Sequence, residues 1–387
     1  MKLKILDIFL FLTFGGSLSA VALLTKLQLN EMAGMIIPGS KLLLMLLCFS
    51  LFIRKPQVAV YNSVQILLLY FIIFCYSLRI LWETITLEIL NLSAGVGNFY
   101  TYFIFFTLLP IMILSRLEYS KIDPIRIVRV IKYSLSVFCI VAFIIYFENI
   151  ITGTRLNNRI DNSVINPLAL SILSGALLIL IVHELIYTKI TILNCLILLF
   201  PLACLFAGGS RGPIVAIIIT VLCISLPAIL KDFNIKKLSV FLILLPPLVS
   251  ITVISVYTRL QQVNIVDDTN SASIRYNLYT SAWDQFLSNP LFGSSLQNEK
   301  YGAINHNFIL DLLLATGLVP VVLFIFTLFN LYYLYIRYPQ TVAFNIFFAM
   351  FFYFLICAQF SGAFYRWETV FVLFVLCVNY RKVIINE

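Results

Sequence analysis

Two acid–base side chains lie close together where a polar segment of this chain meets an apolar one. His306 is one of only two histidines. At neutral pH it can act as a base or as a hydrogen-bond donor. Asp311 follows five residues later inside an apolar run, and an intramembrane carboxylate is expected to face protein rather than lipid. The other histidine, His183, lies deep in an apolar run and is best explained as a satisfied core residue.

Arginines offer a second kind of chemistry. Arg211 lies in Gly208–Pro213 (GGSRGP) between two apolar runs. Glycines there let the backbone approach a ligand, and Ser210 and the free amides of the next helix can bind an anion. Arginine is planar, permanently charged and able to bind phosphate through two parallel hydrogen bonds. Phosphate recognition is therefore predicted here and at a second basic site, Arg155 and Arg159. The alternative is that each arginine snorkels or pairs with a carboxylate.

A long polar segment, residues 258–305, directly precedes His306 and must position it. Part of it predicts a helix that Asn270 or Ser271 can cap and that ends before Pro290. Its apolar stripe at i, i+4 spacing consists of Ile274, Leu278, Ala282 and Phe286. A neighbouring stripe consists of Arg275, Tyr279 and Trp283. Such a helix either lies in a membrane interface or covers a cavity.

The composition requires a membrane around these segments. Hydrophobic residues make up 61% of the 387 residues, charged residues only 11%, and the mean hydropathy is +1.02. A water-soluble globule cannot bury so much apolar surface. This excludes a nucleic-acid-binding protein, despite the net charge of +9, and also a soluble catalytic domain. All eight cysteines lie in apolar runs without a CxxC pair, so neither a disulfide framework nor a zinc site is indicated.

We therefore predict an all-α, polytopic integral membrane protein with about twelve transmembrane helices and one large outer loop that contains short helices. The chain is interpreted as a single membrane domain, 1–387, with the outer loop at about 258–305. The predicted spans are 5–24, 33–53, 58–78, 98–115, 128–147, 166–187, 190–207, 212–230, 238–257, 307–335, 340–361 and 367–380.

Charge asymmetry predicts the orientation of these spans. With Met1 in the cytoplasm, 16 of the 26 lysines and arginines lie in inner loops and ends, as the positive-inside rule requires. Both termini are then cytoplasmic. The other ten, seven of them arginine, lie outside or within spans: Lys26, Lys41, Arg79, Arg155, Arg159, Arg211, Arg259, Arg275, Lys300 and Arg366. This arginine bias favours an anionic substrate at the outer face.

Three short motifs carry a family resemblance over roughly residues 150–320. Gly208–Pro213 resembles the arginine motif of the O-antigen ligase and O-antigen polymerase superfamily. Arg275 with Trp283, followed by Asn289–Gly293, resembles its loop signature. His306 and Asn307, with Gly317 after them, resemble its His–Gly motif. Ser294 and Pro320 stand where the family often has glycine, which leaves the subfamily open.

The resemblance implies a membrane glycosyltransferase that takes a glycan from an undecaprenyl-diphosphate carrier in the bacterial inner membrane, at the periplasmic face. Arginines can stabilise a diphosphate leaving group without a metal, and no cofactor is expected. The catalytic candidates are His306, Arg275 and Arg211, and the substrate-binding candidates are Arg155, Arg159, Tyr279, Trp283, Ser210 and Asn307. The expected partners are the lipid-linked oligosaccharide, the lipid bilayer and a chain-length regulator protein, with no nucleic acid.

Three functions stay open at this point. A polymerase joins lipid-linked repeat units, and we favour it because the outer loop is compact. A ligase transfers the finished glycan to lipid A–core. A flippase for the lipid-linked unit would suit the number of spans, but it requires charges along a transport path. Only Lys41, Glu184 and Asp311 lie deep in the predicted spans.

Overall fold

The computed structural model describes residues 5–29, 63–92, 95–152, 166–187, 192–225, 271–337 and 341–385, together with scattered positions between 32 and 50. Within these residues the chain is helical, and the sole β interaction is an isolated bridge between Asn298 and Ala303. The predicted all-α membrane architecture is confirmed at this level.

Contacts divide the chain into two compact units, which are described separately. Unit 1 comprises Met1–Pro56, Tyr119–Leu260 and Thr341–Cys357. Unit 2 comprises Gln57–Glu118, Gln261–Gln340 and Ala358–Glu387. The interpretation of residues 1–387 as one membrane domain stays a prediction.

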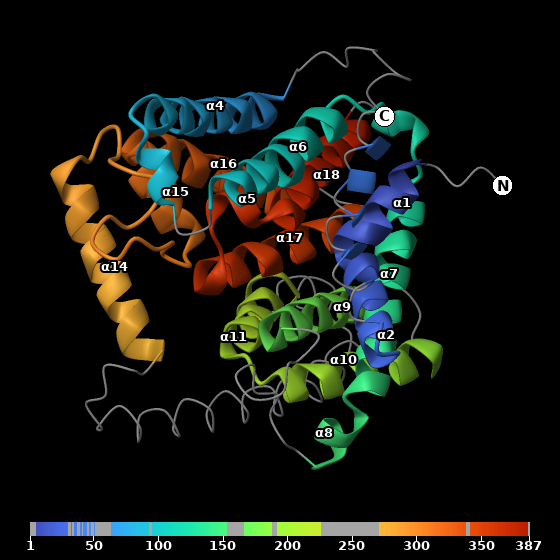
Figure 1. Cartoon of the computed structure of the whole chain (residues 1–387). Helices are drawn as coiled ribbons and strands as arrows, with labels where there is room; N and C mark the ends of the chain where they lie inside the picture. The colour runs from blue at the N-terminus through green and yellow to red at the C-terminus, as the bar shows by residue number, and fades with distance from the viewer. Residues whose placement is uncertain are drawn as a thin grey trace. The chain divides into compact units, whose positions relative to one another are not determined.

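Unit 1 is built around α9 (Pro167–Tyr187), which is apolar on all sides and almost entirely buried. It packs against α7, α10 and α11 (Figure 1). Tyr353 on α17 donates a hydrogen bond of 2.9 Å to the Ile172 carbonyl of α9. The elements around α9 are α1 (Ile5–Phe11), η1 (Leu12–Gly16), α2 (Ser17–Lys26), α7 (Pro124–Ile145), α8 (Phe147–Thr152), α10 (Ile192–Gly208), α11 (Arg211–Thr220), η5 (Val221–Ser225) and α17 (Val342–Ser361), the last of which ends beyond the unit.

Unit 2 places the large polar loop on a group of helices. An aromatic cluster centred on Phe308 joins α15, α16, η6 and α18, with ring centroids 5.0 Å from Phe364, 5.6 Å from Phe324 and 5.9 Å from Phe371. The helix of the large loop, α14, packs on α15, which in turn packs on α4 and α16 (Figure 1). The elements are α4 (Val64–Ile85), η2 (Glu88–Asn91), α5 (Val96–Thr101), η3 (Tyr102–Leu108), α6 (Leu109–Leu114), α14 (Ser271–Ser288), α15 (Phe308–Thr316), α16 (Leu318–Arg337), η6 (Phe364–Arg366) and α18 (Glu368–Ile385).

Six of the described helices are long and apolar enough to cross a membrane: Ile5–Lys26, Val64–Ile85, Pro124–Ile145, Pro167–Ile186, Leu318–Arg337 and Val342–Ser361. Shorter apolar helices cover Phe99–Leu114, Leu196–Gly208 and Arg211–Ile224. The predicted span 238–257 and most of 33–53 lie outside the described residues. The number of twelve spans is therefore not confirmed.

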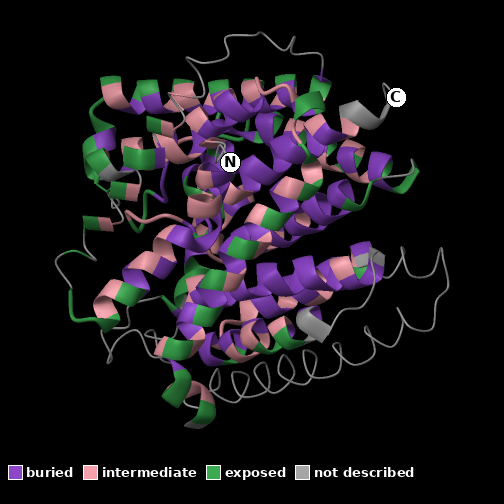
Figure 2. Ribbon diagram, turned by 90° about the vertical axis from the view of Figure 1, so that its right-hand side faces the viewer, coloured by how far each residue is buried: buried purple, intermediate pink, exposed green. Residues whose placement is uncertain are grey.

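The outward faces of these helices are apolar. On α4 the exposed residues Leu67, Phe71, Phe74 and Leu78 recur every three or four positions, so they form one continuous stripe. Large apolar side chains on α16 are exposed in the same way. Figure 2 shows such exposed positions on helices that also carry buried ones. A stripe of this kind is expected where a helix faces lipid.

The predicted span 307–335 is interrupted. α15 ends at Gly317, whose φ of +77° is left-handed, and α16 begins at Leu318. Apolar residues continue across the break, so hydropathy alone merges the two helices. The predicted loop helix is confirmed as α14. Leu278, Ala282 and Phe286 of its apolar stripe are buried, whereas Ile274 is exposed.

Candidate functional site

Two glycines lock the loop after α14 onto the break between α15 and α16. Both have positive φ, +69° at Gly293 and +77° at Gly317. A Cβ on Gly293 would lie 2.2 Å from the Leu314 carbonyl oxygen, and one on Gly317 would lie 2.1 Å from that of Leu291. The Leu318 amide donates to the Pro290 carbonyl at 2.8 Å. These motif glycines are thus required for close backbone packing.

Two charged residues of α4 hold the same loop. The buried carboxylate of Glu83 accepts a 2.6 Å hydrogen bond from the Leu296 amide. One turn earlier, Arg79 donates from Nη2 to the Phe292 carbonyl of the loop at 3.5 Å and from Nε to the Ala315 carbonyl of α15 at 3.0 Å. Arg79 therefore has a structural role, through hydrogen bonds to backbone carbonyls.

His306 lies in a turn whose neighbours on both sides are anchored. The buried Asn305 donates from its amide and its side chain to Asp311 Oδ1, at 3.2 and 2.9 Å. Asn307 caps α15 by accepting from the Leu310 amide at 2.9 Å. Between them His306 has a φ of +53°, a left-handed conformation that is uncommon for a side-chain-bearing residue. Asp311, predicted to face protein, is indeed buried and orients this turn.

Two arginines from distant parts of the chain act on the His306 ring. Arg275 lies on α14, and Arg366 ends η6. Partial burial and then the positive charges of Arg275 and Arg366 lower the pKa of His306 below its ordinary value of about 6.5. The imidazole is therefore neutral at pH 7 and able to accept a proton. Arg366 also interacts electrostatically with Asp311 behind the turn.

Tyrosine side chains lie beside the arginines of this group. The Arg366 guanidinium lies 5.1 Å from the ring centroids of both Tyr102 and Tyr365. Burial raises the pKa of the Tyr279 hydroxyl, although Arg275 and a hydrogen bond with Asn307 act against it, so Tyr279 stays protonated. The structure thus brings Arg275, Tyr279, His306, Asn307 and Arg366 together. We call these five residues the His306 site.

Arg366 is the residue to which the sequence assigned no role. It was counted among the outer cations, but it lies 60 residues after His306, in the polar gap between the last two apolar runs. An arginine in a short polar gap at the outer face was the sequence feature that could have indicated a role for Arg366. The Thr107 hydroxyl fixes this short segment by donating to the Tyr365 carbonyl at 3.1 Å.

The structure describes three of the remaining candidates. Trp283 is half exposed on α14 and packs on Phe286 with ring centroids 5.3 Å apart. Arg211 begins α11 in unit 1 with Ser210 as its N-cap residue, and the Ser210 amide donates to the Ser171 hydroxyl at 3.4 Å. Arg155 and Arg159 lie outside the described residues, so their roles stay predictions.

A comparison with known families agrees with the motifs. A family model described as O-Antigen ligase matches residues 196–325, which is 130 of the 387 residues. This match supports the resemblance of the chain to the O-antigen ligase and O-antigen polymerase superfamily. The matched residues include Arg211, α14, the His306 turn and Gly317, whereas Arg79 and Arg366 lie outside them. No curated protein matches the chain.

The similarity to this superfamily indicates the coarse function. Such proteins are glycosyltransferase-like membrane enzymes whose substrate is a lipid-linked glycan. The apolar helices agree with an integral membrane protein. A neutral histidine between two arginines is a suitable arrangement for this chemistry, because one group can accept a proton while the others stabilise an anion.

Proposed function

We propose that the protein is a polymerase of O-antigen or a related surface polysaccharide, acting at the periplasmic face of the bacterial inner membrane. An acceptor hydroxyl of one lipid-linked repeat unit attacks the anomeric carbon of a second glycan. The new glycosidic bond forms as the bond between that carbon and the diphosphate oxygen breaks. His306 takes the hydroxyl proton, and undecaprenyl diphosphate leaves with the bonding electron pair.

The His306 site carries this proposal. Arg275 and Arg366, which add to the effect of burial in lowering the pKa of His306, are available to the departing diphosphate. Arginine suits this role because its planar guanidinium makes two parallel hydrogen bonds to phosphate. Tyr279 and Asn307 would hold sugar hydroxyls beside the histidine. No step in this scheme requires a metal ion.

The other sequence candidates keep proposed roles in substrate binding. Arg211, with Ser210 and the N-terminus of α11, would bind diphosphate as helix N-termini do. Arg155 or Arg159 would assist, and the exposed Trp283 would pack on sugar or lipid. Cytoplasmic termini and a chain-length regulator as protein partner belong to the same proposal.

The ligase is the second candidate, because the matching family model is itself described as O-Antigen ligase. Lipopolysaccharide from a deletion strain, separated on a gel, distinguishes the two functions. Loss of a polymerase leaves core that bears a single repeat unit. Bare core would overturn our first choice in favour of the ligase, and an unchanged profile would overturn both.

A flippase is tested by reconstitution. Two of the deep charges that a transport path would need are already engaged: Glu184 pairs with Lys132, and Asp311 accepts hydrogen bonds from Asn305. Purified protein in detergent, where no compartments exist, is mixed with lipid-linked repeat units. We expect chain extension, which no flippase can produce. Its absence would count against the polymerase.

A further inference from the structure

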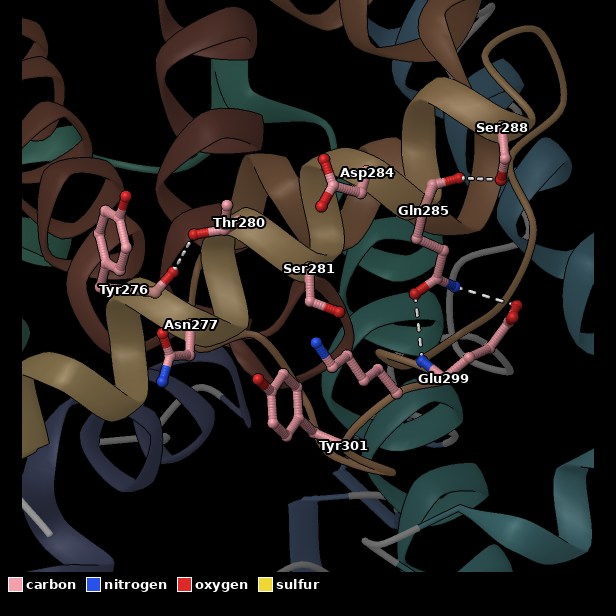
Figure 3. A pocket seen from close by; sticks show the side chains of 10 residues that line it. Tyr276, Asn277, Thr280, Ser281, Asp284, Gln285, Ser288, Glu299 and Tyr301 are labelled. Carbon is pink, nitrogen blue, oxygen red and sulfur yellow. Dashed lines mark hydrogen bonds between the residues drawn. The ribbon is translucent and has the colours of Figure 1, made fainter. Parts of the chain in front are cut away.

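A groove in unit 2 lies on the side of α14 that faces away from the apolar stripe. It has a volume of about 460 Å³ and is formed by α14 and the turn at residues 299–301. Figure 3 shows Asn277, Ser281 and Tyr301 pointing toward the same space. A volume of this size lies within the range of pockets that bind small molecules, roughly 300–1,000 Å³.

The groove and the His306 site occupy opposite faces of one helix. Arg275, Tyr279, Ala282 and Phe286 follow i, i+4, i+7 and i+11 spacing, which defines a single face. The groove residues Asn277, Ser281, Asp284 and Ser288 follow the same spacing but begin two residues later. Two residues turn an α-helix by about 200°. A ligand in the groove therefore makes contacts separate from those of the His306 site.

The side chains of the groove suit uncharged sugars. Tyr276 and Tyr301 are 71% and 45% exposed. Lys300 Nζ lies over one face of the Tyr301 ring, 5.5 Å from its centroid, which leaves the other face and the Tyr276 ring for the C–H faces of a pyranose. The Asn277 amide can both donate to and accept from sugar hydroxyls. The serine and threonine hydroxyls of the groove donate to protein acceptors and can themselves accept from sugar hydroxyls. The two carboxylates, Asp284 and Glu299, outnumber the single cation, Lys300. This charge disfavours a diphosphate, which distinguishes the groove from the arginine-rich His306 site.

Hydrogen bonds hold the walls of the groove in place. Gln285 donates from Nε2 to the Ser294 hydroxyl at 2.7 Å. It also accepts from the Glu299 amide at 3.1 Å (Figure 3). Ser281 donates to Asn298 Oδ1 at 3.2 Å, and Asn298 is completely buried. A site whose side chains are already fixed loses less entropy when a ligand binds.

We propose that this groove is a second glycan-binding site, which takes neutral sugar residues of the polysaccharide away from the bond being formed. The inference rests on the proposed function, because it assigns the groove to the same substrate. A chain held there by its distant sugars stays on the enzyme between additions. The groove would thereby govern how many repeat units are added.

Binding of a lipid-free glycan tests the proposal. The probe is the host strain's own surface polysaccharide, released from its carrier by mild acid, so that it lacks the diphosphate and the lipid. Its affinity for the full-length protein in detergent is measured by titration calorimetry. We expect Tyr301→Ala and Asn277→Ala to bind about tenfold more weakly, as loss of a stacked ring or a fixed hydrogen-bonding group implies. Tyr301→Phe, which keeps the ring, should bind nearly as well as the wild type.

Control variants distinguish a loss of binding at the groove from a loss at the His306 site and from misfolding. Leu287→Ala changes an exposed residue of α14 outside the groove and should bind normally. Arg275→Ala should also bind the lipid-free glycan normally, since that probe carries no phosphate. The proposed glycan-binding role of the groove would be overturned if both groove variants bound with wild-type affinity, or if the wild type did not bind. Groove-dependent binding without any chain extension would instead overturn the proposed polymerase and leave the groove as a glycan-binding site.

Discussion

At the scale of single residues, His306 combines an unfavourable backbone with a favourable charge state. A left-handed φ costs a residue with a side chain roughly 1–2 kcal/mol. The neighbouring asparagines, through Asp311 and the cap of α15, supply hydrogen bonds that hold this conformation. Strain that the surroundings maintain at one titratable residue is a feature of functional sites.

Two replacements of His306 distinguish the effect of its side chain from the effect of its backbone conformation. His306→Gly removes the imidazole and also relieves the left-handed strain, whereas His306→Ala removes only the imidazole. Both variants should lose most glycan transfer. The glycine variant should be more stable than the alanine variant by about 1 kcal/mol. Transfer is measured with lipid-linked units and stability by thermal unfolding in detergent; unchanged chain length in both variants would end the case for a base.

The neutral state of His306 predicts a pH profile. Because its pKa lies below the ordinary value, transfer should hold from about pH 7.5 down to about pH 6.5 and fall only at lower pH. The residual activity of His306→Ala should lack this acid limb. The unfolded chain binds the proton more readily than the folded protein. The stability that His306 contributes is therefore present above about pH 6.5 and is lost as the pH falls below it, through the lower pKa of the folded protein. An acid limb shared by wild type and variant would assign the titration to another group.

The cations of the His306 site predict a requirement for geometry as well as charge. Arg275→Lys keeps the charge but cannot make two parallel hydrogen bonds, so long chains should be lost as fully as in Arg275→Ala. Arg366→Lys should behave in the same way. Arg337→Lys, at the far end of α16, is the matched control. Wild-type banding from Arg275→Lys would remove the case for a planar clamp.

At the scale of elements, α4 acts as the support for the large loop. Its Glu83 lies in the interior and accepts from the loop backbone at Leu296, while the loop glycines close on the end of α15. Neither contact contributes a reacting group. Both keep α14, and with it Arg275, beside the His306 turn.

Removing the Glu83 acceptor should loosen the loop. Glu83→Ala leaves the Leu296 amide without this partner, at an expected cost of about 1–3 kcal/mol, whereas Glu83→Gln keeps an acceptor oxygen and should cost less. Limited proteolysis between residues 289 and 305, together with thermal unfolding, measures the effect. Equal cleavage of wild type and Glu83→Ala would show that the loop does not depend on α4.

Sequence patterns predict an element well when its ends and its periodicity agree. The α14 helix has an N-terminal cap candidate, an i, i+4 stripe and a terminating Pro290, and the structure confirms it. The division between α15 and α16 was missed because apolar residues continue past Gly317. Prediction of the site residues is likewise limited to those that lie in local sequence patterns. His306 and Arg275 follow from motifs, but Arg366 reaches them through tertiary packing that no local pattern encodes.

At the scale of the whole molecule, the distribution of charge predicts one orientation. The positive-inside rule leaves the helix α14 and its loop on the outer side. The exposed apolar stripes of α4 and α16 agree with helices that face lipid. Orientation itself is a prediction that labelling can test.

A single new cysteine reports the side of the membrane. Leu287→Cys lies on an exposed part of α14 and should react in intact spheroplasts with a maleimide that cannot cross the membrane. Arg337→Cys, predicted to be cytoplasmic, should react only after permeabilisation. The wild type gives the background from native thiols, four of which are buried in the described helices. The reverse pattern would invert the predicted topology.

The interlocked glycines also set the limits of a transplantable module. Gly293 lies against the backbone of α15, and Gly317 lies against the loop that precedes Gly293, so neither segment keeps its packing without the other. A chimera that exchanges only the polar loop with a relative would separate two surfaces that fit each other. Exchange of specificity between relatives should therefore take residues 271–318 as one block, with its boundary inside the apolar sequence rather than where the polar sequence ends.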